Sequence, residues 1–293
     1  MNIVVCVKQV PDIEGRVVVE KGVISVQAMV SSNVVNPQDL LAIEEAIRIK
    51  EESGNGKVTV ISLGPSEAEE TLRKCLALGA DDAILLDDSA FIDGDSYATA
   101  YALARAIRPM PHDIILCGQR ADDSQSGQMS AYLARILGVS LVRSVVKVDI
   151  GPDSGSLVLQ RKLSRGDREV VECSLPAVLA VETGLNIPRN ATIKGVLKAR
   201  TRQIPRQGPD DLGLSREETG VAGSMTRTTR ISPPKPKMKG LFVPDSNLSS
   251  ADKLRAIMGG GIVQKKSDYL EGDPDNIAGQ LLRFFREQKV IRE

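Results

Sequence analysis

The sequence has few of the residues on which catalytic and metal sites most often depend. It contains one histidine, no tryptophan and only 3% aromatic residues. A Ser-His-Asp triad or a histidine-based metal site would have to use His112, which follows Pro111 at the start of a predicted strand and is interpreted as a turn residue. Lys plus Arg and Asp plus Glu both number 38, so no net charge favours nucleic acid or an acidic membrane as a partner.

Disulfide patterns and long apolar runs are also missing. The four cysteines form no C-x-x-C pair; they are Cys6, Cys75, Cys117 and Cys173. Their scatter argues against a disulfide framework and favours a reducing compartment. No apolar stretch approaches the roughly 20 residues of a membrane-spanning helix, and the first ten residues are typical of a strand rather than a signal peptide. We therefore expect a soluble, cytoplasmic protein.

Strands and helices alternate over about the first 140 residues. Short apolar runs predict parallel strands covered on both faces, at Ile3–Val7, Val58–Leu63, Ala83–Leu86 and Ile114–Cys117. The segments between and after them have helical periodicity, at 37–52, 66–78, 95–107 and 128–137. Asn36 is expected as the N-cap of the first helix, with Pro37 as its first residue. Repeated strand–helix units predict a doubly wound, mostly parallel α/β sheet.

After residue 140 the pattern changes. Further short strands, with no helix between them, are predicted at Val145–Val148, Leu157–Leu163, Glu169–Glu172 and Ala177–Val181. They could extend the sheet antiparallel or form its edge. The proline-rich residues 203–247 predict an arm that wraps another surface, and amphipathic segments follow at 249–258 and 274–289. The expected parts are a nucleotide-binding domain (1–200), an extended arm that wraps a partner subunit (201–247) and a C-terminal helical segment (248–293).

The segment DDSQSGQMSA is the clearest candidate for a binding site. It joins the fourth predicted strand to a helix, so it presents main-chain N–H groups and a helix N-terminus to an anion. Its serines add hydroxyl donors and its glycine permits close approach. The residues are Asp122, Asp123, Ser124, Gln125, Ser126, Gly127, Gln128, Met129, Ser130 and Ala131. They predict a site for a phosphate-bearing ligand; an ordinary polar connection capped by Ser126 is the alternative.

Other segments would reach the same edge, because the carboxyl ends of parallel strands meet there. They are Cys6, the turn of Asn36, Pro37, Gln38 and Asp39, and Leu63 with Gly64 and Pro65. The Asn36 side chain and the free N–H groups of its helix could contact an adenine or a ribose. The acidic pairs at 81–82 and 87–88 are interpreted as solvated caps. Neither G-x-G-x-x-G nor G-x-x-x-x-G-K-[ST] occurs, which argues against a Rossmann dehydrogenase and a P-loop ATPase.

Five blocks in order resemble the β subunit of an electron-transfer flavoprotein: VCVKQVPD, NPQDLLAIEEAIRIKE, VISLGPSEAEETLRKCLALGAD, SGQMSA and LPAVLAVETGLNIPRNATIKGVLKAR. The similarity runs from Met1 to about Arg200 and is weaker beyond. It implies an adenine-nucleotide α-hydrolase-like fold and a heterodimer whose α subunit holds most of a redox FAD. It also implies that AMP contacts Cys6, residues 36–39, Leu63 and residues 122–131.

The resemblance further implies an electron carrier that performs no bond chemistry itself. Electrons would come from dehydrogenases such as acyl-CoA dehydrogenases and pass to a quinone-linked or other acceptor. The segment from Arg189 to Lys198 would dock the dehydrogenase, with Ile193 as an apolar anchor. Packing of a helix face is the alternative for Ile193.

Two features depart from the commonest family pattern. Residues 163–167, Leu-Ser-Arg-Gly-Asp, replace an acidic residue and an Asp-Gly-Gly, and Arg165 brings a cation instead. Electron-bifurcating relatives carry a second FAD in place of AMP, and the stretch Phe91–Asp95 resembles that branch, whereas the loop SQSGQMS is nearer the AMP type. AMP is therefore favoured over a second FAD. A stand-alone adenine-nucleotide-binding stress or signalling protein is the alternative of another class.

Overall fold

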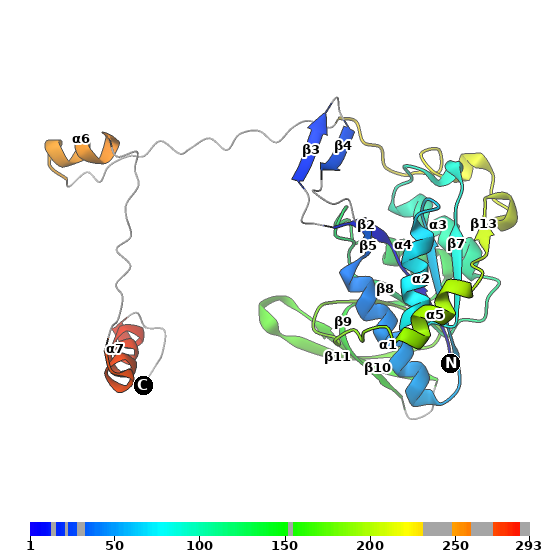
Figure 1. The fold of residues 1–293 in the computed structure, drawn as a ribbon, viewed down its shortest axis with the longest axis horizontal. Coiled ribbons are helices and arrows are strands. Elements are labelled where there is room, and N and C mark those ends of the chain that lie inside the picture. The colour runs from blue at the N-terminus through cyan, green and yellow to red at the C-terminus, as the bar shows by residue number, and fades with distance from the viewer. Residues whose placement is uncertain are drawn as a thin grey trace. The chain divides into compact units, whose positions relative to one another are not determined.

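The computed structural model describes residues 1–12, 16–20, 23–27, 33–151, 155–230, 248–258 and 272–287. The chain divides into two compact units, Met1–Pro233 and Pro234–Glu293 (Figure 1). The expected boundary near residue 200 does not coincide with this division, because residues 201–230 belong to the first unit. Residues 231–247 of the expected arm lie outside the described residues, so its wrapping of a partner stays a prediction.

A nine-stranded sheet forms the centre of the first unit, in the order β11-β10-β9-β12-β8-β1-β6-β7-β13. Every neighbouring pair from β9 to β13 in this order is parallel, while β10 and β11 are antiparallel additions at one edge. The fold is therefore the expected mostly parallel α/β sheet. The strands are β1 (Asn2–Cys6), β6 (Lys57–Leu63), β7 (Asp82–Leu86), β8 (Ile114–Gly118), β9 (Ser140–Ile150), β10 (Ser156–Lys162), β11 (Arg168–Ser174), β12 (Ala177–Val181) and β13 (Arg206–Gln207).

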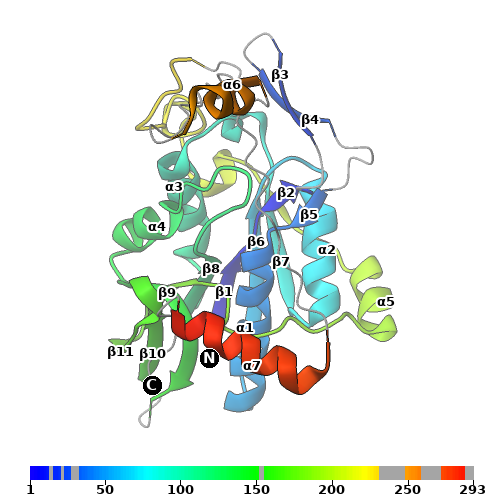
Figure 2. The same cartoon turned by 90° about the vertical axis from the view of Figure 1, so that its left-hand side faces the viewer.

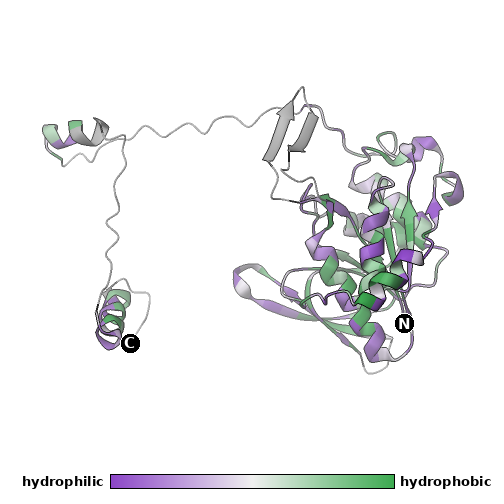
Figure 3. Ribbon diagram, viewed as in Figure 1, coloured by the Kyte–Doolittle hydropathy of each residue, from purple (hydrophilic) through white to green (hydrophobic). Residues whose placement is uncertain are grey.

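Helices cover both faces of the sheet. The helices of this unit are α1 (Pro37–Ser53), α2 (Ala68–Leu78), α3 (Ser96–Ile107), α4 (Met129–Leu137) and α5 (Ile193–Thr201). Side chains of α1 and α2 share one buried core with Ile3 and Val5, whereas side chains of α3 and α4 share the other with Val4 and Cys6. This alternation follows from the period of two along a strand. Figure 2 shows α3 and α4 on one side of the sheet and α2 on the other, and in Figure 3 the central strands are hydrophobic.

The strand β12 lies in the interior of the sheet and not in its antiparallel part. It pairs in parallel with β8 on one side and β9 on the other, and all of its residues are buried. Its sequence, AVLAV, is apolar throughout, as suits a strand covered on both faces. The sequence predicted an antiparallel or edge position for this strand, because it directly follows the β10–β11 hairpin and consecutive strands joined by short turns are usually antiparallel.

Residues 9–35 contain strands that were not expected from the sequence. β2 (Gln9–Pro11) pairs with β5 (Asn33–Val35), and β3 (Arg16–Glu20) pairs with β4 (Val23–Gln27), as two small antiparallel sheets.

The second unit contains α6 (Ser250–Met258) and α7 (Pro274–Glu287), which confirm the two amphipathic segments. Four large apolar side chains of α7 are exposed, those of Leu281, Leu282, Phe284 and Phe285, while Ile277 is half-buried. Across the described residues, no helix combines the length and the apolar character needed to cross a membrane.

Candidate functional site

A cavity of about 940 Å³ lies at the carboxyl ends of the parallel strands, where a ligand site in an open α/β sheet is expected. This volume is near the upper end of the range found for cofactor pockets. Of the predicted site residues, those that line the cavity are Cys6, Asn36, Asp39, Leu63, Ser124, Ser126, Gly127, Gln128, Met129 and Ser130. Those that do not line it are Pro37, Gln38, Asp122, Asp123, Gln125 and Ala131. The four separate segments do converge. This agrees with the rule that ligands bind at the carboxyl ends of parallel strands, which we call the strand-end rule.

Asp39 joins three segments at the floor of this cavity. It lies in the first turn of α1, and its carboxylate accepts hydrogen bonds from the N–H of Lys8, at 2.8 Å, and of Gly118, at 2.9 Å. Burial raises the pKa of Asp39 to about 6, against the lowering effect of these bonds and of the Asn36 amide. A Cβ at Gly118 would lie 2.5 Å from the Asp39 Oδ1, so this close approach requires glycine.

The side chain of Asn36 supports the binding loop instead of capping its own helix. Asn36 precedes α1 as expected, but makes no side-chain capping hydrogen bond. Its Nδ2 donates to the carbonyl of Arg120 at 3.1 Å, and its Oδ1 accepts from the N–H of Asp122 at 3.1 Å. Gln38 adds a similar bond, because its Oε1 accepts from the N–H of Arg120 at 2.8 Å. Both side chains therefore position the loop, and the Asn36 amide is already paired within the protein.

The N-terminus of α4 supplies donors for an anion. No main-chain N–H from Ser126 to Ser130 donates to an atom among the described residues, as expected for the first turn of a helix. The Ser130 hydroxyl is buried, lines the cavity and also has no partner there. Gly127 has a φ of 60°, and a Cβ on it would meet Arg120 at 3.0 Å. The Ser126 hydroxyl lies 2.9 Å from that of Ser96, at the start of α3, so both helix N-termini reach the cavity.

Cys6 and Leu63 give the cavity its apolar floor. Cys6 ends β1 and Leu63 ends β6, and both are members of, or pack against, the core on the α3–α4 face. Burial raises the pKa of the Cys6 thiol to about 12, with the nearby charge of Asp39 adding to the shift. The thiol is therefore neutral and acts as a small apolar contact rather than as a nucleophile.

One wall of the cavity was not expected from the sequence. It consists of the segment that follows β7, residues 87–96 with Ala90 excepted, together with Thr226 and Thr228. Asp88 is a cap, as expected, since it accepts from the N–H of Ala90 at 2.8 Å, but it also lines the cavity. The strand-end rule contains the signal for the first segment, because β7 ends at the same edge as β1, β6 and β8. No local pattern marks the two threonines.

The predicted docking segment lies far along the chain from these residues and is held by Arg189. This guanidinium donates to Glu44 at 2.9 Å and to Glu51 at 2.7 Å, both on α1, so Arg189 fixes the loop before α5. Hydrogen bonds from Glu51 and Glu44 raise the pKa of Arg189 far above its usual value. Thr192 then caps α5 by accepting from the N–H of Gly195 at 3.0 Å.

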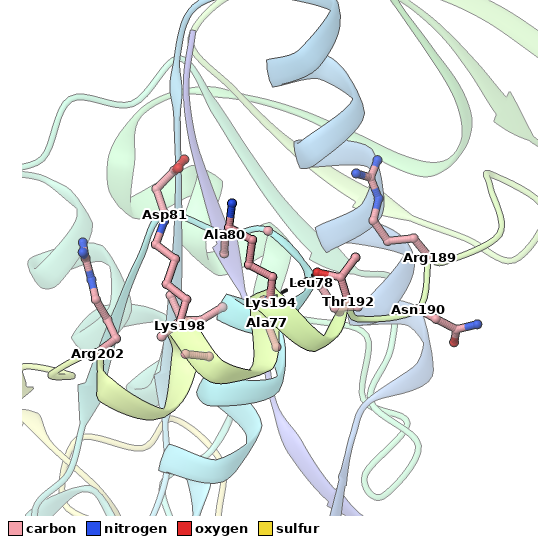
Figure 4. A pocket seen from close by; sticks show the side chains of 14 residues that line it. Ala77, Leu78, Ala80, Asp81, Arg189, Asn190, Thr192, Lys194, Lys198 and Arg202 are labelled. Carbon is pink, nitrogen blue, oxygen red and sulfur yellow. Dashed lines mark hydrogen bonds between the residues drawn. The ribbon is translucent and has the colours of Figure 1, made fainter.

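The exposed face of α5 is apolar. Ile193 is 83% exposed and Leu197 is 58% exposed, so packing of Ile193 inside this unit is excluded. On the other side of the helix, Lys194 and Lys198 line a smaller pocket of about 310 Å³ between α5 and the end of α2 (Figure 4). The backbones there are in close contact, because a Cβ at Gly195 would lie 2.3 Å from the carbonyl oxygen of Ala77.

The comparisons with known proteins agree with this architecture. The electron transfer flavoprotein domain matches residues 25–212. The chain is 40% identical to the electron transfer flavoprotein subunit beta of Thermoanaerobacterium thermosaccharolyticum, over 82% of this chain and 91% of that protein. It is 36% identical to the caffeyl-CoA reductase–Etf complex subunit CarD of Acetobacterium woodii, over 80% and 88%. It is 34% identical to the protein FixA of Azotobacter vinelandii, over 87% and 92%. The chain belongs to the β-subunit family of the electron transfer flavoproteins.

Proposed function

We propose that this chain pairs with an electron-transfer flavoprotein α subunit, which holds most of an FAD, and that it binds AMP in the cavity at the carboxyl edge. The pair takes electrons from dehydrogenases, such as acyl-CoA dehydrogenases, and delivers them to a quinone-linked or other acceptor. The observation that supports this best is the convergence of the strand ends and the 122–131 loop on one cavity. Among the described residues that line it there is no histidine, and the one thiol is buried and neutral.

The residues of the cavity suit an adenylate. The unpaired N–H groups from Ser126 to Ser130 and the Ser130 hydroxyl would hold its phosphate, with the helix dipole of α4 in support. Cys6 and Leu63 offer an apolar surface to the base, and Gly64 leaves space beside it. These contacts bind and position a nucleotide, while the flavin of the heterodimer supplies the electron transfer when it is bound.

A second FAD in the same cavity is the other candidate. The wall formed by residues 87–96 and by Thr226 and Thr228 extends the cavity beyond the segments that AMP is expected to contact. The relative CarD is named as a subunit of a reductase–Etf complex, which is consistent with a chain of this type working inside a larger redox assembly. The loop sequence SQSGQMS still favours AMP.

Counting the cofactors decides between these proposals. The chain is produced together with its α subunit, the pair is purified, and bound nucleotides are released by heat and separated by chromatography. We expect a yellow pair with one FAD and one AMP. Two FAD and no AMP would support the bifurcating alternative. A colourless pair, or a chain that carries hydrolysable ATP and binds no α subunit, would refute the proposed function.

Docking of the dehydrogenase is assigned to the exposed face of α5. Ile193 and Leu197 form its apolar part, and an aliphatic side chain inserted into a partner's pocket is a common binding hot spot. Arg189 acts here by positioning the loop, since its donors are taken by Glu44 and Glu51. Lys198 lies on the same helix, where it lines the smaller pocket, and would contribute a positive charge to docking rather than an apolar contact.

A further inference from the structure

Residues 219–228, which we call the strap, pack closely against the loop 88–96 that lines the cavity. A Cβ at Gly220, where φ is 53°, would lie 2.3 Å from the carbonyl oxygen of Ala90. A Cβ at Gly94 would lie 3.2 Å from the Cα of Gly220. The two backbones are thus in direct contact, at a position where side chains would separate them. The strap belongs to the part of the chain that the sequence predicted as an arm.

Asp95 connects the strap to the helix α3. Its Oδ1 accepts from the N–H groups of Tyr97 and Ala98, at 3.0 Å and 2.9 Å, which caps the helix. Its Oδ2 accepts from both the N–H and the hydroxyl of Thr226, each at 2.8 Å. The N–H of Asp95 donates to the hydroxyl of Ser224 at 2.9 Å. One carboxylate therefore serves both as an N-cap and as the attachment of the strap.

The two sides of the cavity differ in charge. The α4 side presents unpaired N–H groups and a buried hydroxyl, which suit a phosphate. The opposite side is lined by Thr228 of the strap and by Asp93 of the loop 88–96, a residue with a φ of 58° that makes no hydrogen bond or ion pair among the described residues. A carboxylate repels phosphate but accepts hydrogen bonds from hydroxyl groups. A nucleotide whose phosphate lies toward α4 therefore meets the N–H donors there and keeps its phosphate away from the Asp93 carboxylate.

We propose that the strap is the outer wall of the nucleotide site, that Asp95 holds it there as a positioning residue, and that Thr228 and Asp93 bind hydroxyl groups of the nucleotide. This inference rests on the proposed function, because it needs a nucleotide in the cavity. It adds one ligand contact from the segment after β7, Asp93, and one from far along the chain, Thr228.

The first test compares two neighbouring threonines in the purified αβ pair. Thr228 lines the cavity and Thr229 does not, so Thr228→Val and Thr229→Val are a matched pair. After the bound nucleotide is removed, AMP and, separately, FAD are titrated by calorimetry. Loss of one neutral hydrogen bond predicts roughly fivefold weaker binding for Thr228→Val of whichever nucleotide the wild type binds, and no change for Thr229→Val. Equal affinities for both variants and the wild type would overturn the inference.

The second test breaks the attachment of the strap and keeps the helix cap. In Asp95→Asn the side-chain oxygen can still cap α3, since asparagine is a good N-cap, but its amide group would face the N–H of Thr226, donor against donor. Trypsin cleavage after Arg227, followed by mass spectrometry, reports whether the strap is held. We expect nucleotide to slow this cleavage in the wild type, and Asp95→Asn to speed it severalfold and to lose the protection. Cleavage after Lys162, in the exposed β10–β11 hairpin, should not change.

The outcomes separate the two levels of the proposal. If the wild-type pair binds neither AMP nor FAD, the proposed function fails. If it binds one of them but the nucleotide does not protect Arg227, and Asp95→Asn is cleaved like the wild type, the strap inference alone is wrong.

Discussion

The cavity at the carboxyl edge and the exposed helix α5 use charged residues in opposite ways. At the cavity, the buried Asp39 accepts hydrogen bonds from the main chain of two strand ends, and the charge faces inward. Next to α5, Arg189 and Glu51 lie partly in solvent, Glu44 is buried, and the three together hold a loop, while Ile193 is exposed. In the first region, the carboxylate of Asp39 is buried and hydrogen-bonded, which ties α1 to the ends of two strands. The second presents an apolar side chain on a clamped loop.

We therefore expect substitutions at the cavity to lower the free energy of unfolding, and substitutions on the exposed face of α5 to affect function alone. Where a side chain is buried and hydrogen-bonded to the main chain, nearly every substitution should lower the free energy of unfolding. An exposed docking face can change its side chains with little effect on the folded state.

The largest effect is expected at Gly118. A methyl group there would clash with Asp39 Oδ1 at 2.5 Å and Gln38 Cβ at 2.8 Å, so Gly118→Ala should lower the free energy of unfolding by about 3 kcal/mol. Gly208→Ala is the control, because its nearest neighbour would lie at an ordinary 3.5 Å. Urea unfolding at pH 7 measures both. A stability of Gly118→Ala equal to that of the control would mean that the edge is not packed as described.

The next effect is a dependence of stability on pH that comes from Asp39. Its pKa is raised by burial from 3.8 to about 6, so the folded state holds this proton to higher pH than the unfolded state does. Its contribution to stability therefore falls as pH rises through this window. Between pH 5 and 7 the wild type should lose roughly 1 kcal/mol relative to Asp39→Asn, which cannot titrate there. Urea unfolding at several pH values checks this, and parallel curves for the two proteins would contradict it.

Arg189 should influence docking more than folding. Arg189→Lys loses the forked contact with Glu44 and Glu51. Because lysine keeps a positive charge beside the buried Glu44, and the pair with Glu51 is partly in solvent, we expect a stability loss of less than about 1 kcal/mol. The loosened loop should lower kcat/KM for electron transfer from a dehydrogenase severalfold, with cofactor content unchanged. Arg200→Lys, the same change on an exposed residue of α5, serves as the control. Equal kinetics for the two variants would show that the clamp does not position the docking face.

The smallest effect on stability is expected at Ile193. Because this side chain is 83% exposed, Ile193→Ala should change the free energy of unfolding by less than about 0.5 kcal/mol. The same change should raise KM for the dehydrogenase roughly tenfold, if its side chain fills a pocket of the partner. Leu254→Ala, which removes a 61% exposed apolar side chain from α6, should leave KM as it is. An unchanged KM for Ile193→Ala would move the docking surface elsewhere.

The parallel part of the fold could be predicted from the sequence because its strands are apolar throughout. The runs that contain Val4, Val60 and Ile115 are short and apolar and alternate with segments of clear helical periodicity, so a strand is the natural interpretation of each. The wholly apolar sequence of β12 also predicts a strand. It does not predict the position of that strand in the sheet, because its partners β8 and β9 are determined by tertiary packing. The helix α5 is harder to recognise, because Ala199 is its only buried residue and no apolar face points to a core.

The candidate site shows the same limit. The rule that ligands bind at the carboxyl ends of parallel strands led to Cys6, Leu63 and the 122–131 loop, and ten of the predicted site residues line the cavity, among them Asn36 and Asp39 at the start of α1. The role of Asn36 in holding the loop through Arg120 and Asp122 could not be read from its position before a helix, where a cap is the usual expectation. Thr226 and Thr228 come from a segment without periodicity, whose path is decided by the close contact of Gly220 with Ala90.

The position of β12 has a consequence for synthesis of the protein on the ribosome. Because β12 lies between β8 and β9, the sheet consists of two separate pieces until residue 181 has left the exit tunnel. During that interval the free edge of β8 presents unpaired backbone groups that another nascent chain could join. Chains truncated before β12 should therefore aggregate, whereas truncation after the strap should leave the whole sheet able to close.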